Sequence, residues 1–170
     1  SRASDFSGYD AGFRKLSPPG NVMATDGLYS DKVTITWDAS PGATHYQIYR
    51  SNSGDPQYAI NISGPLWLGG TSFDDPDVVQ GSTYTYYIKA SKSQFGSNVS
   101  DMSEGDAGWI AFTTAPTATA SDGIFTNRIA VSWNTVPSAT HYMVYRSTSG
   151  IPNSATPITA WQTANSYADY

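Results

Sequence analysis

The sequence predicts an all-β protein of two antiparallel β-sandwich domains in tandem. Apolar and polar residues alternate in short runs such as Val33-Thr34-Ile35-Thr36-Trp37, the pattern of a strand with one buried face. Turn-forming Gly, Pro and Asp residues separate these runs, and no amphipathic helical stripe is visible. The chain also repeats itself, with Trp37 recurring as Trp133, 96 positions later. A repeat of that length lets each copy hold its own core.

The phase of the repeat predicts the domain organisation. Ala43-Thr44-His45-Tyr46 recurs as Ala139-Thr140-His141-Tyr142, whereas residues 4–16 match the end of a unit, residues 100–112. We therefore expect a piece of a longer protein, with three parts. These are a terminal G strand of a preceding domain (1–17), a complete domain (18–114) and an incomplete domain with strands A to E (115–170).

The first strands of the complete domain follow from alternation and turns. Strand A is expected near 20–25, because Asp26-Gly27 then provides a turn. Strand B is expected at 32–38, where Val33, Ile35 and Trp37 alternate with polar residues. Strand C is expected at 43–50, after the turn Ser40-Pro41-Gly42.

The remaining strands follow by the same rules. Strand C′ is expected near 57–62, after Ser53-Gly54-Asp55-Pro56, and strand E near 66–74. Strand F is expected at 82–91, where Tyr84, Tyr86 and Ile88 alternate, and strand G near 105–113. The corresponding strands of the incomplete domain are A near 116–120, B at 128–134, C at 139–146, C′ near 155–160 and E near 161–168.

These strands resemble the fibronectin type III family. The family signature includes the Trp that ends strand B (Trp37, Trp133) and the Ala-x-x-Tyr-x-Ile/Val-Tyr-Arg pattern of strand C. Residues 78–90 resemble its Leu-x-Pro-Gly-Thr-x-Tyr segment, with Gln80 where the family prefers Pro. The resemblance implies immunoglobulin-like sandwiches in which Trp37 and Trp133 are structural and Tyr84 is a corner tyrosine bound to backbone.

Composition excludes several classes of function. The net charge is −5, and the nine Lys and Arg residues are scattered, which argues against a nucleic-acid partner. No apolar run is long enough to insert into a membrane. The absence of Cys excludes disulfides and thiolate metal sites. We find no catalytic constellation and no motif for a cofactor, so we expect no enzyme activity.

Repeated aromatic residues are the candidate binding residues. Trp67 recurs as Trp161 in the strand E region, and Tyr49 recurs as Tyr145 on strand C. Exposed rings at these places would stack on sugar rings or on a partner protein. The structural alternative is that the rings cover a sheet edge or pack at a domain junction.

An acidic cluster is a weak candidate for a Ca²⁺ site. Asp74, Asp75 and Asp77 lie in the loop expected after strand E, and Ca²⁺ prefers six to eight oxygen ligands. Asp residues that form a turn before Pro76 explain the same cluster without a metal.

The tandem pattern favours a non-enzymatic structural module that is extracellular or on the cell surface: a stalk, spacer or fibre with adhesive capacity. The resemblance to bacterial tandem arrays on surface or secreted proteins implies this location. Its partners would be neighbouring repeats or copies of itself, with surface glycans or proteins as further candidates. Two alternatives remain: a filament subunit assembling by strand complementation through Ser4–Leu16, and a carbohydrate-binding accessory module of a secreted hydrolase.

Overall fold

The structure, a computed structural model, describes residues 12 and 14–170. The chain divides into two compact units, which we call unit 1 (Ser1–Ala111) and unit 2 (Phe112–Tyr170). The sequence places the boundary three positions later, between 114 and 115. The described residues form strands and two short 3₁₀ helices, which confirms the all-β fold class, and include no helix long and apolar enough to span a membrane.

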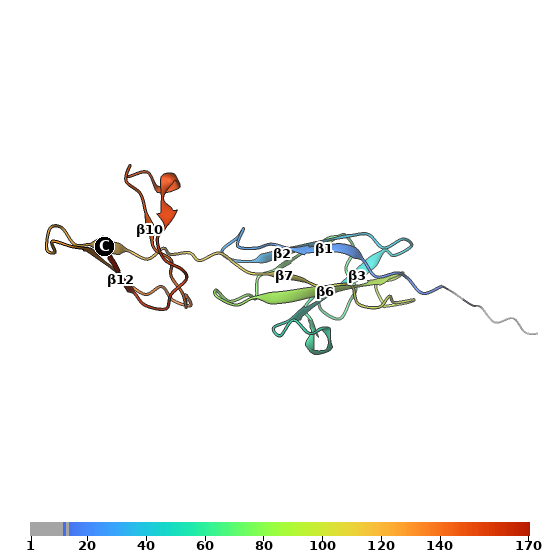
Figure 1. Cartoon of the computed structure of the whole chain (residues 1–170). Coiled ribbons are helices and arrows are strands. Elements are labelled where there is room, and N and C mark those ends of the chain that lie inside the picture. The colour runs from blue at the N-terminus through green and yellow to red at the C-terminus, as the bar shows by residue number, and fades with distance from the viewer. Residues whose placement is uncertain (1–11, 13) are drawn as a thin grey trace, which may run out of the picture. The chain divides into compact units, whose positions relative to one another are not determined.

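Unit 1 contains two antiparallel sheets (Figure 1). One sheet has the strand order β1-β2-β5 and the other the order β4-β3-β6-β7. The strands are β1 (Gly20–Ala24), β2 (Val33–Asp38), β3 (His45–Ser51), β4 (Ile60–Asn61), β5 (Ser72–Asp75), β6 (Tyr84–Ser91) and β7 (Asp106–Gly108). They correspond in order to the expected strands A, B, E and C′, C, F, G of the two sheets.

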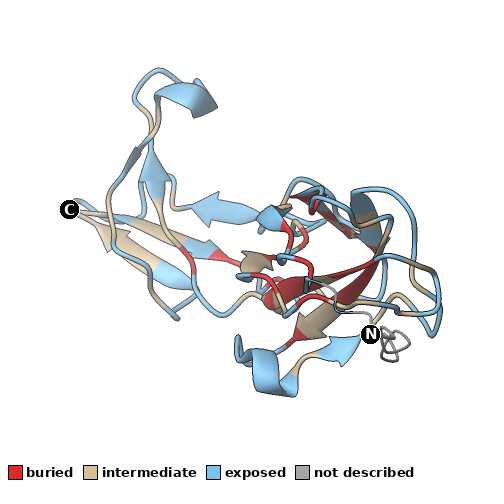
Figure 2. Ribbon diagram, turned by 90° about the vertical axis from the view of Figure 1, so that its right-hand side faces the viewer, coloured by how far each residue is buried: buried red, intermediate tan, exposed pale blue. Residues whose placement is uncertain are grey.

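The core of unit 1 lies between these sheets. Val33 and Ile35 of β2 are fully buried, as are Ile48 of β3 and Tyr86 and Ile88 of β6. The buried residues of β2 and of β6 are two positions apart, as the sequence pattern predicts, because successive side chains of a strand point to opposite faces. Figure 2 shows the buried residues concentrated in the strands of this unit.

Strands β3 and β6 form the longest pairing among the described residues. Their register runs without interruption from His45↔Ser91 to Ser51↔Thr85. β6 also pairs with β7, and β3 also pairs with β4. Both β3 and β6 are therefore interior strands, which explains why they bury side chains on both faces, such as Gln47 and Tyr87.

Strand E is shorter than the sequence predicts, because its first part pairs with the other sheet. The N–H of Tyr46 donates to the Leu68 carbonyl at 2.7 Å, and the N–H of Leu68 donates to the Tyr46 carbonyl at 2.8 Å. The chain then crosses to β2, where the backbone N–H of Trp37 donates to the Thr71 carbonyl at 3.2 Å. Gly70, at φ 90°, provides the turn between the two pairings.

Other elements are also shorter than expected. The expected C′ region begins with a 3₁₀ helix (Pro56–Tyr58) before β4, because Asp55 caps Gln57 and Pro56 stands at the first helical position. The expected strand G contains only β7, followed by a single bridge between Trp109 and Asp26.

The N-terminal segment differs from its expected role at its described end. Residues 1–11 and 13 lie outside the described residues, so most of the expected G strand of residues 1–17 is not observed. Leu16, however, is 7% exposed and belongs to the core of unit 1. The Ser17 carbonyl accepts a hydrogen bond from the Ser40 hydroxyl, and the Arg14 carbonyl accepts one from Asn98 at 3.0 Å. This part of the segment therefore packs on the domain that follows it.

Unit 2 repeats the β1-β2-β5 sheet as a sheet of order β12-β9-β8. Its strands are β8 (Ala118–Ala120), β9 (Ile129–Trp133), β10 (Tyr145–Arg146), β11 (Thr156–Pro157) and β12 (Ser166–Asp169). β10 pairs with β11 alone, and a 3₁₀ helix (Pro152–Ser154) joins them. Regular pairing is thus confined to small parts of the strands expected at 139–146 and 161–168.

Candidate functional site

The candidate aromatic residues of unit 1 are packed against their own domain. The Tyr49 hydroxyl donates to Gln47 Oε1 at 3.0 Å, and the Lys89 ammonium lies over the Tyr49 ring, 5.3 Å from its centroid. Burial raises the pKa of the Tyr49 hydroxyl. Trp67 is half-buried beside Gly96, where a Cβ atom would lie 2.8 Å from the indole nitrogen. Both rings are therefore only partly exposed.

The equivalent residues of unit 2 are exposed. Trp161 is 64% exposed and Tyr145 is 55% exposed. A cavity of about 280 Å³ lies between them, and its lining includes Phe112, His141 and Tyr142. The structure therefore brings Tyr145 and Trp161 together at one apolar hollow.

The two structural Trp residues form matching pairs in the two cores. Trp37 contacts Tyr46 with ring centroids 5.4 Å apart, and Trp133 contacts Tyr142 at 5.8 Å. The Tyr46 hydroxyl accepts from the N–H of Ser40 at 3.2 Å, and the Tyr142 hydroxyl accepts from the N–H of Val136 at 2.9 Å. Each pair links strand B to strand C and fixes the turn between them.

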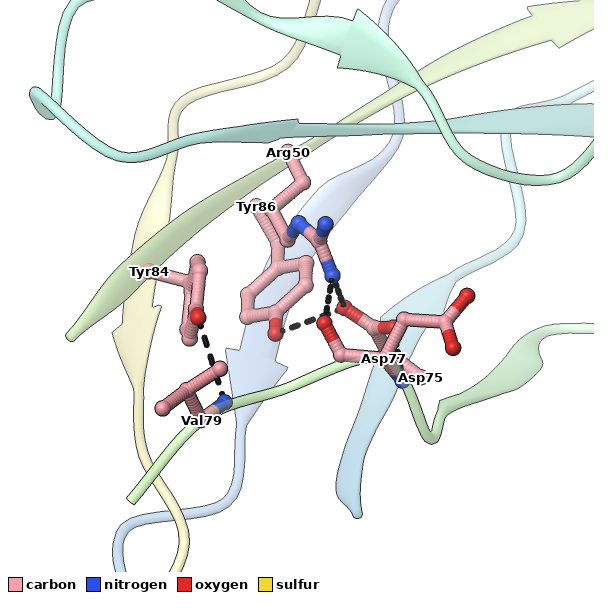
Figure 3. Close-up of polar contacts among 6 residues, drawn as sticks. All are labelled: Arg50, Asp75, Asp77, Val79, Tyr84 and Tyr86. Carbon is pink, nitrogen blue, oxygen red and sulfur yellow. Dashed lines mark hydrogen bonds and ion pairs between the residues drawn. The ribbon is translucent and has the colours of Figure 1, made fainter. Parts of the chain in front are cut away.

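Tyr84 lies at the corner before strand F. Its ring is 6% exposed, and its hydroxyl accepts a hydrogen bond from the N–H of Val79 at 3.1 Å (Figure 3). This bond satisfies a polar group that would otherwise be buried without a partner. The Arg50 guanidinium also lies 4.9 Å from the centroid of the Tyr84 ring.

A buried ion pair connects the two sheets of unit 1 (Figure 3). Arg50 of β3 donates to Asp75 Oδ2 of β5 at 2.7 Å and to the Asp77 carbonyl at 2.6 Å. The Tyr86 hydroxyl donates to the same Asp75 oxygen at 3.0 Å. Burial lowers the pKa of Arg50, but the hydrogen bond and the charge of Asp75 outweigh it, so that the pKa is raised. Burial and the Asp75 charge raise the pKa of Tyr86 well above its usual range.

The acidic cluster is not arranged as a metal site. Asp74 and Asp75 are neighbours on β5 and point to opposite faces, with Asp74 exposed and Asp75 buried. Lys32 binds Asp74 at 2.6 Å, whereas Arg50 binds Asp75. The hydrogen bonds from Lys32 and Thr34 lower the pKa of Asp74. Asp77 contributes only its carbonyl to Arg50, so the Ca²⁺ interpretation of Asp74, Asp75 and Asp77 does not fit this geometry.

Sequence reasoning missed the ion pair, although the repeat contains its signal. Arg146 of unit 2 donates to both carboxylate oxygens of Asp169, at 2.9 and 3.0 Å. These residues are the second copies of Arg50 and Asp75. An Arg and an Asp that recur together, on strands that pair with different neighbours, point to a contact between the sheets.

No reacting centre is assembled in the part of the chain that the structure describes. It holds no group of three or more His, Asp or Glu residues that could bind a metal ion. His45 and His141 each have a neighbouring Thr hydroxyl at the ring Nδ1, at 2.7 and 3.0 Å. Each of these contacts joins two residues that are adjacent in the sequence.

Comparison with known proteins finds relatives that are much longer than this chain. No family model matches. The chain is 42% identical over 72 residues to an amylopullulanase of Thermoanaerobacterium saccharolyticum, and the match covers 42% of this chain and 5% of that protein. It is 39% identical over 72 residues to an amylopullulanase of Thermoanaerobacterium thermosulfurigenes, covering 42% of this chain and 4% of that protein.

Solved structures similar to the chain are fibronectin-type proteins. One is an Fn3-like protein from Clostridium thermocellum, with 23% identity and a TM-score of 0.47, covering 60% of this chain and 100% of that chain. Another comprises the chicken CNTN1 FN1-FN3 domains, with 18% identity and a TM-score of 0.39, covering 91% of this chain and 58% of that chain.

The strand order of unit 1 identifies its fold. Strands A, B and E form one sheet and strands C′, C, F and G form the other, a sandwich with the corner tyrosine Tyr84 before strand F. With this strand order, the chain contains a fibronectin type III-like domain followed by a second unit that repeats its sequence.

Proposed function

We propose that the chain is a non-catalytic accessory module of a secreted enzyme that degrades α-glucans, and that it acts there as a spacer. The observation that carries this proposal is the 42% identity over 72 residues to an amylopullulanase. The matched segment is a small part of that enzyme, as expected for a module that accompanies the catalytic domains. The fold alone does not decide this role, because one fold serves many unrelated functions.

The arrangement of carboxylates supports a non-catalytic role. Hydrolysis of a glycosidic bond typically uses two carboxyl groups that face each other across the substrate. In unit 1, Asp74 and Asp75 face away from each other, and Lys32 and Arg50 neutralise them. Both carboxylates therefore form ion pairs within the domain and do not face each other as an acid–base pair would.

The packing of the repeated aromatic residues favours a spacer over a sugar-binding module. A binding site preserved by the repeat would present the same rings in both units. Tyr49 and Trp67 of unit 1 are instead half-buried, and only Tyr145 and Trp161 of unit 2 are exposed. We place the module outside the cell, because polymeric glucans are degraded there.

Native gel electrophoresis in the presence of soluble amylopectin or pullulan tests the proposal. The chain is expected to migrate at the same rate with and without polymer, and to release no reducing sugar from it. Retardation by polymer, reduced by Trp161→Ala and retained by Phe95→Ala, would instead establish a sugar-binding module. Phe95 is a suitable control because its ring is 77% exposed and lies in unit 1. Release of reducing sugar would overturn the non-catalytic role.

A further inference from the structure

The loop between the first two strands of each unit places a cation on an aromatic ring. In unit 1, the Lys32 ammonium lies 4.9 Å from the centroid of the Tyr29 ring. In unit 2, the counterparts are Arg128 and Phe125, and the Arg128 Cζ atom lies 4.0 Å from the ring centroid. Tyr29 and Phe125 are equally exposed, at 38% each. The loop is therefore built in the same way in both units, and the ring holds the cation in place.

In unit 1, a carboxylate of β5 neutralises this cation. Lys32 Nζ donates to Asp74 Oδ2 at 2.6 Å, and the Thr34 hydroxyl donates to Asp74 Oδ1 at 2.7 Å. These two hydrogen bonds lower the pKa of Asp74. Both carboxylate oxygens have a donor, so the charge of Lys32 is balanced within the domain.

In unit 2, smaller residues replace the partners of the cation. Ala130 of β9 stands in the place of Thr34, and Ala168 of β12 stands in the place of Asp74. The strands and the loop that form this place are present in both units, so the difference arises from residue type. The two replacements remove the counter-charge of Arg128 and leave space beside it.

No other acidic side chain of unit 2 neutralises Arg128. The unit contains two acidic side chains, Asp122 and Asp169. Asp169 binds Arg146 through both of its carboxylate oxygens. Arg128 forms no ion pair and donates no hydrogen bond to any residue that the structure describes. It is therefore a cation held on a ring and without an acceptor.

A hollow of about 360 Å³ lies beside Arg128 on the sheet β12-β9-β8. The side chains of β9 and β12 around it are small, and two of them carry hydroxyls: Ala130, Ser132, Ser166 and Ala168. They alternate along the strands with Val131 and Tyr167, which pack against the core of unit 2. Because successive side chains of a strand point to opposite faces, the hollow lies on the face away from the core.

We propose that this hollow binds a uronate, a sugar ring that carries a carboxylate, as part of an acidic polysaccharide. The carboxylate would take the place that the Asp74 side chain has in unit 1 and accept two parallel hydrogen bonds from Arg128. The hydroxyls of Ser132 and Ser166 line the same hollow and would bind the hydroxyls of the sugar ring. We call Arg128, Ser132 and Ser166 the uronate site.

The make-up of the uronate site favours an acidic sugar over a neutral sugar and over a peptide. An uncharged glucan has no group that neutralises Arg128. An extended peptide binds by pairing with an open strand edge, whereas β9 already pairs with β8 on one side and with β12 on the other. A uronate supplies both a carboxylate for the cation and hydroxyls for the two Ser residues.

Titration of the ¹⁵N-labelled full chain with trigalacturonate, followed by NMR, tests the proposal. The backbone amide resonances of Ser132 and Ser166 are expected to shift as the ligand is added. The affinity should fall when the salt concentration is raised from about 0.05 M to about 0.5 M, because salt screens an exposed ion pair. Arg128→Gln should weaken binding at least ~10-fold, since it removes the charge and the parallel hydrogen bonds. Lys32→Gln is the matched control and should leave the affinity unchanged, because Asp74 already binds Lys32.

A second variant tests whether the ligand takes the place of the missing acidic side chain. Ala168→Asp restores at this position the acid that unit 1 has, and its carboxylate should bind Arg128. Binding of trigalacturonate should then weaken at least ~10-fold, because the cation is neutralised within the domain as Lys32 is in unit 1. Near-ultraviolet circular dichroism checks that each variant keeps the fold of the wild-type chain.

The proposal is overturned if the amides of Ser132 and Ser166 do not shift at trigalacturonate concentrations up to about 10 mM. It is also overturned if Arg128→Gln or Ala168→Asp binds as tightly as the wild-type chain. Equal binding of maltotriose would show that the charge has no part in recognition, and equal binding of a triglutamate peptide would show that the sugar ring has none; either result contradicts a uronate site. The spacer role is tested separately, because amylopectin and pullulan carry no carboxylate.

Discussion

At the scale of single residues, the contact between the sheets of unit 1 depends on charges that are removed from water. The Arg50 side chain is 15% exposed and the Asp75 side chain 3%. Burying such a pair requires that nearly every polar atom finds a partner, and the Asp77 carbonyl and the Tyr86 hydroxyl supply two of them. Removing one member therefore affects stability more than the strength of one hydrogen bond suggests.

Replacement of the buried carboxylate should destabilise unit 1 strongly. We expect Asp75→Ala to lower the free energy of unfolding by about 3–5 kcal/mol, because it leaves the Arg50 charge without its partner. Asp74→Ala is the control, since the Asp74 side chain is 49% exposed, and it should lower that free energy by at most about 1 kcal/mol. Urea unfolding followed by Trp fluorescence measures both free energies. Similar losses in the two variants would show that the buried Arg50–Asp75 pair stabilises unit 1 no more than the exposed Lys32–Asp74 pair does.

The buried hydroxyl of Tyr86 should make unit 1 less stable in alkali. The pKa of Tyr86 in the folded chain lies above the value of 10.0 for an unperturbed Tyr. Below pH 10 both states keep the proton; above it the unfolded chain loses its proton first, so stability falls as the pH rises. Between about pH 9 and pH 11, the wild-type chain should lose about 1 kcal/mol more than Tyr86→Phe. Parallel losses in urea titrations of the two chains would contradict this assignment.

At the scale of elements, close approach of strands sets limits that the strand pattern alone does not show. β7 passes so near β1 and β2 that a Cβ on Gly108 would lie 2.7 Å from Ala24 Cβ and 2.9 Å from Val33 Cγ1. Asp106 of the same strand accepts a hydrogen bond from the N–H of Ala24 at 2.8 Å. Strand G therefore holds the edge of the other sheet, and its glycine makes the approach possible.

A methyl group at this approach should disturb the packing of unit 1. We expect Gly108→Ala to lower the free energy of unfolding by about 1–3 kcal/mol through overpacking, which corresponds to a fall in Tm of about 4–8 °C per kcal/mol. Gly69→Ala should have little effect, because nothing lies within 4 Å of its Cβ position. Differential scanning calorimetry compares the two variants. Equal Tm values would mean that the strands around Gly108 move apart without a loss of stability.

At the scale of the whole molecule, the two units repeat one sequence but differ in how much they bury. The buried core of unit 1 includes residues of β2, β3 and β6. The buried core of unit 2 consists of Trp133, Val136 and Tyr142. Buried apolar area is the main source of stability. The two units should therefore differ in stability although their sequences correspond.

Thermal unfolding of the full chain should show two transitions, with unit 2 unfolding first. Trp133→Ala is expected to lower the first transition only, and Trp37→Ala the second only, because each ring belongs to one core. Each substitution should remove about 3–5 kcal/mol from its own unit. A single transition that both variants lower equally would show that the units unfold together.

The sequence by itself determined the fold class, the order of the strands and the repeat. Alternation and turn residues are local signals, and they placed strands such as β2 and β6 within a few residues. Only the tertiary structure showed that Leu68 pairs with Tyr46 before strand E begins, and that Asp74 and Asp75 bind different cations. It also separated Trp67, which is half-buried, from Trp161, which is exposed. These differences depend on which distant segment covers a residue, and spacing along the chain does not contain that information.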